Sequence, residues 1–311
     1  MQQFLAFVLL LLLPAGSWAQ QRLAKAPTRP AATKAIETVQ ARYARLDQFA
    51  QQLPDAQATS LSRLAAALAT QARTEDDKAR LIFAWVAQHI AYDVAYLNGD
   101  TTRSYGPEQV LQSRVAICQG YADLFTDLAI RMGLTANTVT GYAAVDATQP
   151  VCPMLGTDGA HAWNVYRAAG TVHIADPCWG AGFVSSDYQC FTHKLNSFWF
   201  DTSPAQAIFL HFPSDDSWQL LPTPVASTVF RQWPYVEATW FRLGVSGASM
   251  AQALAITKGR PKPKPLPMVY PTSHQVQIVK VPRQATLVAG QPVTFVFAVA
   301  PGVELGFESN E

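Results

Sequence analysis

The sequence has 311 residues and a formal net charge of +1; only 14% of its residues are charged, whereas 49% are hydrophobic. This length is sufficient for one large or two moderate domains with a buried core. The sequence contains no basic run typical of nucleic-acid binding and no acidic tail. We therefore expect a globular protein that does not act on nucleic acid.

The first residues have the pattern of a secretory signal. An apolar run at 4–13 precedes small residues that end at Ala19, as before a signal cleavage site. We expect residues 1–19 to be a signal peptide, although the usual positive charges are missing and an uncleaved anchor is the alternative. No later stretch is long and apolar enough to span a bilayer. The remaining chain would then be secreted or periplasmic, in the cell envelope.

Several helices are predicted next. Residues 20–33 are rich in Pro and Ala and predict a flexible leader. Helical patterns follow at 33–53 and 58–71, separated by Pro54-Asp55. A third helix is predicted after Thr74, which is a suitable N-cap and is followed by acidic residues. A short helix is expected at 107–113.

A cysteine stands at the start of the next predicted helix. Cys118 precedes apolar residues at three- and four-residue steps, and Gly133 would end the helix. These apolar residues are Tyr121, Ala122, Phe125, Leu128, Ala129 and Met132. A thiol in the first turn of a helix lies near the positive end of the macrodipole, which stabilises the thiolate. Buried cysteines are also common as small hydrophobes, so this pattern alone does not establish catalysis.

A hairpin downstream of Cys118 carries a histidine and an aspartate. Residues 159–167 alternate as a strand does, Ala169-Gly170 predicts a turn, and 171–176 would return. In this hairpin His161 would lie almost directly across from Asp176. Cys118, His161 and Asp176 would then be a nucleophile, its base and the group that orients the base. With a strand at 138–145 the hairpin predicts a small antiparallel sheet against the helices, an α+β fold.

The motifs that carry these residues resemble the transglutaminase-like superfamily. They are Tyr-Asp at 92–93, Cys-Gln-Gly-Tyr-Ala at 118–122, His-Ala-Trp-Asn at 161–164 and Asp-Pro-Cys-Trp-Gly at 176–180. They are most similar to the kyphoscoliosis-peptidase-like bacterial branch, as is the segment 209–221 with its His-Phe-Pro and Trp-Gln-Leu. The resemblance covers roughly 74–221 and implies a papain-like core with a Cys118, His161, Asp176 triad. Cys178 departs from the family, which more often has another small or polar residue there.

Other residues near the motifs are candidates for the cleft. Tyr92 and Asp93 either line it, as the resemblance implies, or Asp93 caps the element that follows. Gln119 or Trp163 would help to bind the oxyanion, but the backbone N–H of Cys118 is the better candidate, because a helix start supplies free donors.

Aromatic residues and the remaining histidines have structural interpretations. Tyr142 and Trp179 are predicted to be walls of the cleft or core. His173 has odd spacing from Asp176, so it would face the other side of the strand and be structural. The sequence names no partner for His193 and His211.

The other cysteines leave their pairing open. If Cys118 stays free, Cys152, Cys178 and Cys190 allow one disulfide and leave one thiol over. There is no Cys-x-x-Cys pair and the six histidines are scattered, so we expect no metal and no cofactor.

The domain boundaries follow from these patterns. We expect a catalytic domain at 34–222, a β-rich extension at 223–257 with a strand at 237–245, and a Pro/Lys-rich linker at 258–271. A small β module at 272–311, comparable to an incomplete Ig-like module, would contain strands at 275–281, 285–288 and 292–300. No chemistry is predicted for this module.

The predicted function is that of an exported cysteine-dependent acyl-transfer enzyme. It would attack a peptide or glutamine carboxamide through a thioester, with a protein or peptide substrate in the cell envelope. Water as acceptor makes a peptidase or amidase, which the resemblance favours, and a lysine amine makes a crosslinking transglutaminase. The alternative is a non-catalytic exported binding or scaffold protein, which a disulfide between Cys118 and Cys178 would favour. The oligomeric state stays open.

Overall fold

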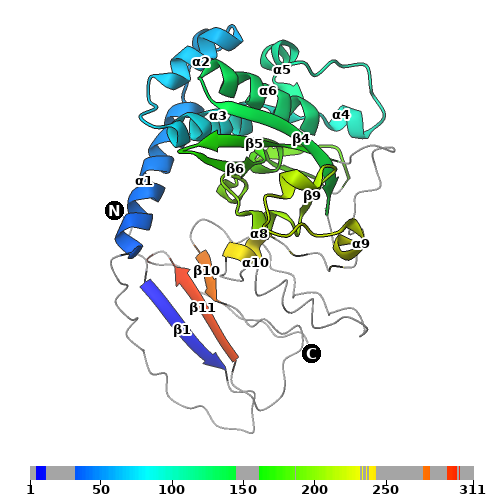
Figure 1. Ribbon diagram of the computed structural model, residues 1–311. Coiled ribbons are helices and arrows are strands. Elements are labelled where there is room, and N and C mark those ends of the chain that lie inside the picture. Colours follow the sequence, from blue (N-terminus) through cyan, green and yellow to red (C-terminus); the bar gives the residue numbers. More distant parts are fainter. Residues whose placement is uncertain are drawn as a thin grey trace. The chain divides into compact units, whose positions relative to one another are not determined.

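The computed structural model describes residues 5–11, 32–144, 161–185, 187–231, 233, 236, 238–242, 276–280, 293–299 and 301. Two compact units are present, one of residues 31–233 and one of residues 1–30 with 234–311. The larger unit combines helices with a small antiparallel sheet (Figure 1). The predicted α+β class is therefore confirmed.

The predicted helices of the larger unit are present. They are α1 (Ala32–Gln51), α2 (Leu61–Ala69), α3 (Glu75–His89), α5 (Pro107–Ser113) and α6 (Cys118–Arg131), with the short η1 (Asp55–Gln57) and α4 (Val94–Leu97) between them. The hydroxyl of Thr74 accepts from the backbone N–H of Asp77 at 3.1 Å, so the predicted N-cap of α3 is confirmed. Ser60 caps α2 in the same way, which is why α2 begins three residues later than the sequence pattern indicated.

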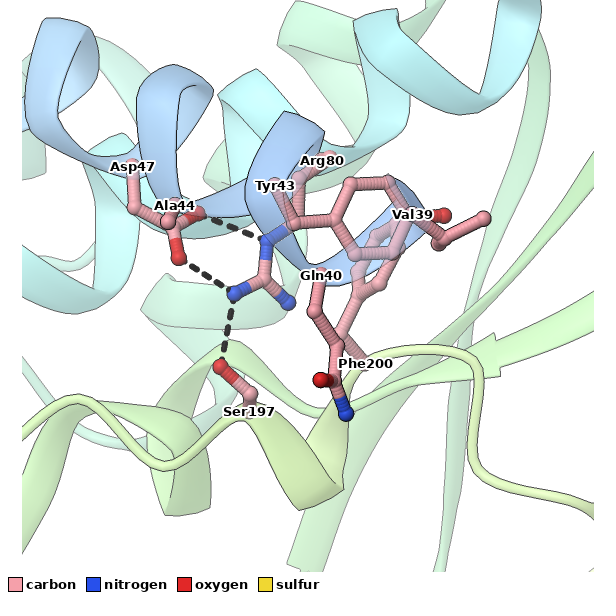
Figure 2. Close-up of a pocket in the computed structure, with 8 residues that line it drawn as sticks. All are labelled: Val39, Gln40, Tyr43, Ala44, Asp47, Arg80, Ser197 and Phe200. Carbon is pink, nitrogen blue, oxygen red and sulfur yellow. Dashed lines mark hydrogen bonds and ion pairs between the residues drawn. The ribbon is translucent and has the colours of Figure 1, made fainter. Parts of the chain in front are cut away.

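A buried arginine joins α1 to α3. Arg80 is only 1% exposed, and its guanidinium donates to both carboxylate oxygens of Asp47 at 2.7 and 2.6 Å. It also donates to Ser197 of η2 (Ser197–Trp199) at 2.7 Å. The rings of Tyr43 and Phe200 lie 5.0 and 4.9 Å from the guanidinium carbon. Figure 2 shows this arrangement in the wall of a cavity of about 620 Å³.

The sheet has the strand order β6-β5-β4-β9, and all neighbours are antiparallel. Its strands are β4 (Thr135–Ala143), β5 (His161–Ala168), β6 (Thr171–Ala175) and β9 (His211–Pro213). The predicted hairpin is confirmed as β5 and β6, in which Ala168 pairs with Thr171 and Asn164 with Ala175. Asp176 lies one residue beyond the end of β6.

Both faces of β5 are covered. On one face α6 packs over β4 and β5 (Figure 1), and Asn164 donates to the backbone oxygen of Ala122 at 2.8 Å. On the other face is an apolar cluster of Val139, Trp163, Val165, Ile174 and Ala207. A strand buried on both faces is held in one register, because a slip would move its apolar side chains.

A glycine lets three strands approach at one point. Gly141 of β4 pairs with His161 on one side and with Pro213 on the other. A Cβ at this position would lie 2.2 Å from the backbone oxygen of Phe212 and 2.7 Å from the ring of Trp163. The absence of a side chain here therefore sets the spacing of β5 and β9 about β4.

Shorter elements complete the larger unit. They are the parallel pair β2 (Ala91–Tyr92) and β3 (Val115–Ala116), then α7 (Pro177–Ala181), β7 (Gly182–Val184), β8 (Phe191–His193), α8 (Pro204–Ala207), η3 (Asp216–Gln219) and α9 (Ser227–Phe230).

The smaller unit contains a three-stranded antiparallel sheet in the order β1-β11-β10. Its strands are β1 (Leu5–Leu11), β10 (Val276–Lys280) and β11 (Val293–Val299). The strands predicted at 275–281 and 292–300 are confirmed, whereas 285–288 and the linker 258–271 lie outside the described residues. β1 falls in the predicted signal peptide, whose cleavage stays a prediction.

The predicted β-rich extension is wrong in its described part. Residues 237–245 were expected to form a strand, but Ala238–Arg242 is helix α10, and α9 is also helical. Trp240 and Phe241 are adjacent and both buried, which does not fit a strand with one buried face, because neighbouring side chains of a strand point to opposite faces. None of the described helices is long and apolar enough to cross a membrane.

Candidate active site

Cys118 is the first residue of α6, and its side chain is almost fully buried. Burial by itself would raise the pKa of the thiol. The hydrogen bond to His161, the charge of that imidazole and the backbone N–H of Ala162 outweigh burial and lower the pKa of Cys118. The lowered pKa favours the thiolate form of Cys118.

His161 begins β5 and connects Cys118 to Asp176. Its Nε2 donates to Oδ2 of Asp176 at 2.6 Å, with both side chains buried. Burial works against the protonated imidazole, but the carboxylate of Asp176 and the thiol of Cys118 together raise the pKa of His161 to about 10. The structure therefore favours a thiolate and imidazolium pair.

Asp176 is fixed from several sides. It is the N-cap of α7, and its Oδ1 accepts from the backbone N–H of Trp179 at 2.8 Å. Its own backbone N–H donates to the oxygen of Trp199 at 2.8 Å. Burial would raise the pKa of the carboxyl, but His161 above all, and then His211, hold it well below its usual range. The three residues predicted as a triad are thus brought together.

A second histidine on Asp176 was missed in the sequence. Nε2 of His211, the first residue of β9, lies 2.7 Å from Oδ2 of Asp176. The only signal was that His211 belongs to the His-Phe-Pro segment of the resemblance, which gives no role for it. No local pattern connects a three-residue strand to an aspartate 35 positions earlier.

His161, Asp176 and His211 also place three ligand atoms within 4.8 Å of one another. Both imidazole nitrogens lie 2.6 and 2.7 Å from the same carboxylate oxygen, which is hydrogen-bond geometry. A metal ion would need lone pairs on these nitrogens in place of their N–H groups. The raised pKa of His161 opposes that change, so the cluster fits proton chemistry better than metal binding.

The alternative that Asp93 is a cap is confirmed. Its carboxylate accepts from the backbone N–H groups of Ala95 and Tyr96 at 3.1 and 3.4 Å, at the start of α4. It also binds the hydroxyl of Tyr105 and the guanidinium of Arg103, each at 3.1 Å. These contacts occupy both of its oxygens. Tyr92 lies beside it in β2 and is half-buried.

Gln119 does not direct its amide to the thiol. Its Nε2 donates to both carboxylate oxygens of Asp123, each at 2.9 Å. The backbone N–H of Cys118 stays the predicted oxyanion donor, since the first residue of a helix has a free N–H.

The aromatic candidates occupy different places. Trp163 is buried, with its ring 6.0 Å from that of His161, and Trp179 is half-buried with its ring at 5.2 Å. Both are walls around the histidine. Tyr142 lies against Arg231, 5.7 Å from the guanidinium carbon, and has no described contact with the triad.

Two other described histidines, His173 and His193, bond to groups other than Asp176. His173 bonds to Asp201 at 2.7 Å and stacks on Tyr166, so its predicted separation from Asp176 is confirmed. His193 contacts the backbone oxygen of Ala87 at 3.4 Å.

Cys118, Cys178 and Cys190 are free thiols, and Cys152 lies outside the described residues. A disulfide between Cys118 and Cys178, which would have favoured the scaffold alternative, is therefore not formed. Burial raises the pKa of the Cys178 thiol well above its usual value, so this neighbour stays protonated.

Comparison with known proteins shows which family this chain is similar to. Residues 62–175 match the model of the transglutaminase-like superfamily. Human kyphoscoliosis peptidase is 31% identical over 206 residues, which is 66% of this chain and 31% of that protein. Hillarin of Drosophila melanogaster is 25% identical over 236 residues, 70% of this chain and 28% of that protein.

The similarity to a solved structure described as a TGase covers 55% of this chain and 42% of that chain, with 19% identity and a TM-score of 0.29. The chain spans about a third of the length of the curated relatives. The family match contains Cys118 and His161 and ends one residue before Asp176. Residues 62–175 of this chain thus belong to the transglutaminase-like superfamily.

Proposed function

We propose that this protein is a cysteine-dependent acyl-transfer enzyme that acts as a peptidase or amidase. The observation that carries the proposal is the buried series of hydrogen bonds from Cys118 through His161 to Asp176. The lowered pKa of the thiol and the raised pKa of the imidazole are what a nucleophile and its acid–base partner require. The similarity to a protein named kyphoscoliosis peptidase favours hydrolysis.

The reaction begins with attack of the Cys118 thiolate on a carbonyl carbon. A bond forms between sulfur and carbon, and the carbonyl electron pair moves to oxygen, where the backbone N–H of Cys118 stabilises it. When the intermediate collapses, the imidazolium of His161 gives its proton to the departing nitrogen. The products of this half-reaction are a thioester and neutral His161.

The second half-reaction regenerates the enzyme. His161 takes a proton from water, the resulting hydroxide attacks the thioester, and Cys118 leaves as the thiolate beside a renewed imidazolium. Asp176 keeps its charge throughout. It holds His161 in the tautomer in which the other ring nitrogen is available to the sulfur of Cys118. An amine in place of water would give crosslinking by the same steps.

The test is to trap the acyl-enzyme. The purified chain is incubated with a peptide library, quenched in acid and measured by intact mass; an acyl adduct on Cys118 and release of free amine are expected. The Cys118→Ala variant should form no adduct, whereas Cys178→Ala, which removes the neighbouring buried thiol, should still form it.

A fluorescent primary amine in the same assay distinguishes the acceptors, because its incorporation in place of hydrolysis would identify a transglutaminase. No adduct with any peptide would support the non-catalytic alternative.

A further inference from the structure

His211 lies at the centre of the site, yet the proposed chemistry does not use it. It is buried, and its Nε2 is 2.7 Å from the carboxylate oxygen of Asp176 that also accepts the hydrogen bond from His161. Three indole rings surround it, with centroids 4.7–4.9 Å from its own. They belong to Trp163, Trp179 and Trp199. Such an environment strengthens hydrogen bonds because water does not compete for them.

The tautomer of His211 follows from its contacts. Nδ1 is buried and has no hydrogen-bond partner among the described residues. A bare nitrogen there costs less than a buried N–H without an acceptor. Burial first, and the nearby charge of His161, lower the pKa of His211 despite its bond to Asp176. His211 is therefore neutral, with its proton on Nε2, and donates to Asp176.

The position of His211 is set by the sheet. His211 pairs with Ala143 of β4, while His161 pairs with Gly141 of the same strand. β4 thus holds the two histidines on its two sides, and both reach the same oxygen of Asp176. The other oxygen is occupied by the backbone N–H of Trp179. The carboxylate is consequently fixed by three donors.

We propose that His211 is a positioning residue of this site, which as a neutral Nε2–H donor holds the Asp176 carboxylate ionised and directed at His161. It does not touch the sulfur or the substrate. It acts through Asp176, because a carboxylate that keeps its charge and orientation keeps the imidazolium of His161 and hence the thiolate of Cys118. This inference rests on the proposed cysteine chemistry.

The experiment compares two variants in the full-length chain. His211→Phe keeps a ring but removes the donor, and His211→Gln keeps an N–H donor near the position of Nε2. The readout is the rate of Cys118 alkylation by iodoacetamide against pH, with mass spectrometry locating the label. His211→Phe should move the midpoint of the profile up by about one pH unit, a tenfold loss of thiolate below it, and His211→Gln should recover most of this loss.

The matched control is His173→Phe, the same substitution at a histidine of the same sheet that bonds to Asp201 and not to Asp176. It should leave the profile unchanged. A His211→Phe protein that melts at a lower temperature but has the wild-type profile would show a structural role only and overturn the proposal. His211→Gln behaving like His211→Phe would overturn it as well, because the donor would then be irrelevant.

Two further results keep the inference testable if His211→Phe fails to fold. In the wild-type chain, long-range proton–nitrogen NMR spectra should show His211 neutral with Nε2 protonated, and a proton on Nδ1 would overturn the proposal. The exposed Cys190 is the internal reference for alkylation. If wild-type Cys118 reacts no faster than Cys190, the proposed function fails, whereas the NMR result still decides whether His211 donates to Asp176.

Discussion

At the residue scale, the site depends on competition between burial and charge. Burial would make Cys118 a neutral thiol and His161 a neutral imidazole, and it is the largest influence on each. The contacts among Cys118, His161 and Asp176 reverse both effects, because each charged form is stabilised by its neighbour. The pH dependence of the reactivity of Cys118 should therefore reflect the coupled titration of Cys118 and His161, more than the pKa of either residue alone.

The pH profile is a direct test of this pair. Because the pKa of Cys118 is lowered, we expect its alkylation to remain fast below the pH at which ordinary thiols react, and to slow as falling pH restores its proton. Because the pKa of His161 is raised to about 10, peptide turnover should fall as the pH rises through about 10, where the leaving group loses its proton donor. A single rise in alkylation near pH 8.5, as for a free cysteine, would contradict the pair.

Asp176→Asn tests the source of the raised pKa of His161. Without the carboxylate, burial should lower the pKa of His161 and raise that of Cys118. We expect turnover to decrease by about 10²–10⁴-fold, the usual contribution of acid–base catalysis. Asp201→Asn, which changes the partner of His173, should leave both the turnover and the alkylation of Cys118 unchanged. Equal losses in both variants would indicate damage to the sheet instead.

At the element scale, the packing of three strands around Gly141 places the histidines. A methyl group here would collide with backbone on β9 and with Trp163, so the strands would have to separate. A second constraint at this scale is the bond from Arg80 to Asp47 and Ser197, which ties α1 and η2 to α3.

Gly141→Ala should destabilise the fold by about 1–3 kcal/mol, the usual cost of overpacking a core. Because the clash lies between β4 and β9, Cys118 should also lose reactivity through displacement of His211. Urea denaturation and alkylation measure the two effects. Thr140→Ala, at the exposed neighbouring position, should change stability by no more than about 0.5 kcal/mol. Equal stability of both variants would show that β9 tolerates the methyl group.

Arg80→Met should cost about 3 kcal/mol, because it leaves Asp47 without its partner in a largely buried site. Arg131→Met is the matched control, since Arg131 pairs with Asp127 on the exposed surface of α6. Its cost should be below about 1 kcal/mol. Chemical denaturation of the two variants measures their free energies of unfolding. Similar losses in both would mean that the ion pair of Arg80 contributes no more stability than a surface ion pair.

At the scale of the whole molecule, the described triad and His211 all lie in the unit of residues 31–233. We expect a fragment of residues 31–233 to unfold in one cooperative transition and to keep the alkylation profile of the full-length chain. Circular dichroism and labelling of Cys118 measure this. A fragment that folds but loses the activated thiol would show that the remaining residues contribute to the site.

The sequence alone was sufficient for the features that depend on neighbours along the chain. Thr74 caps α3 because its hydroxyl reaches an N–H three residues later, and α6 follows from the spacing of the apolar residues after Cys118. The hairpin also followed from alternation and a tight turn, and it placed His161 near Asp176. Such local rules did not predict α10, whose buried residues were misread as part of a strand.

The tertiary structure decided what depends on distant contacts. His211 reaches Asp176 only because β9 pairs with β4, and a strand of three residues has no periodicity from which to predict that pairing. The further partners of Asp93, Tyr105 and Arg103, are also contacts that its role as a local cap does not predict. The residue types of the triad were readable in the sequence, but the group that holds its carboxylate required the fold, because hydrogen bonds across a sheet join residues that are far apart along the chain.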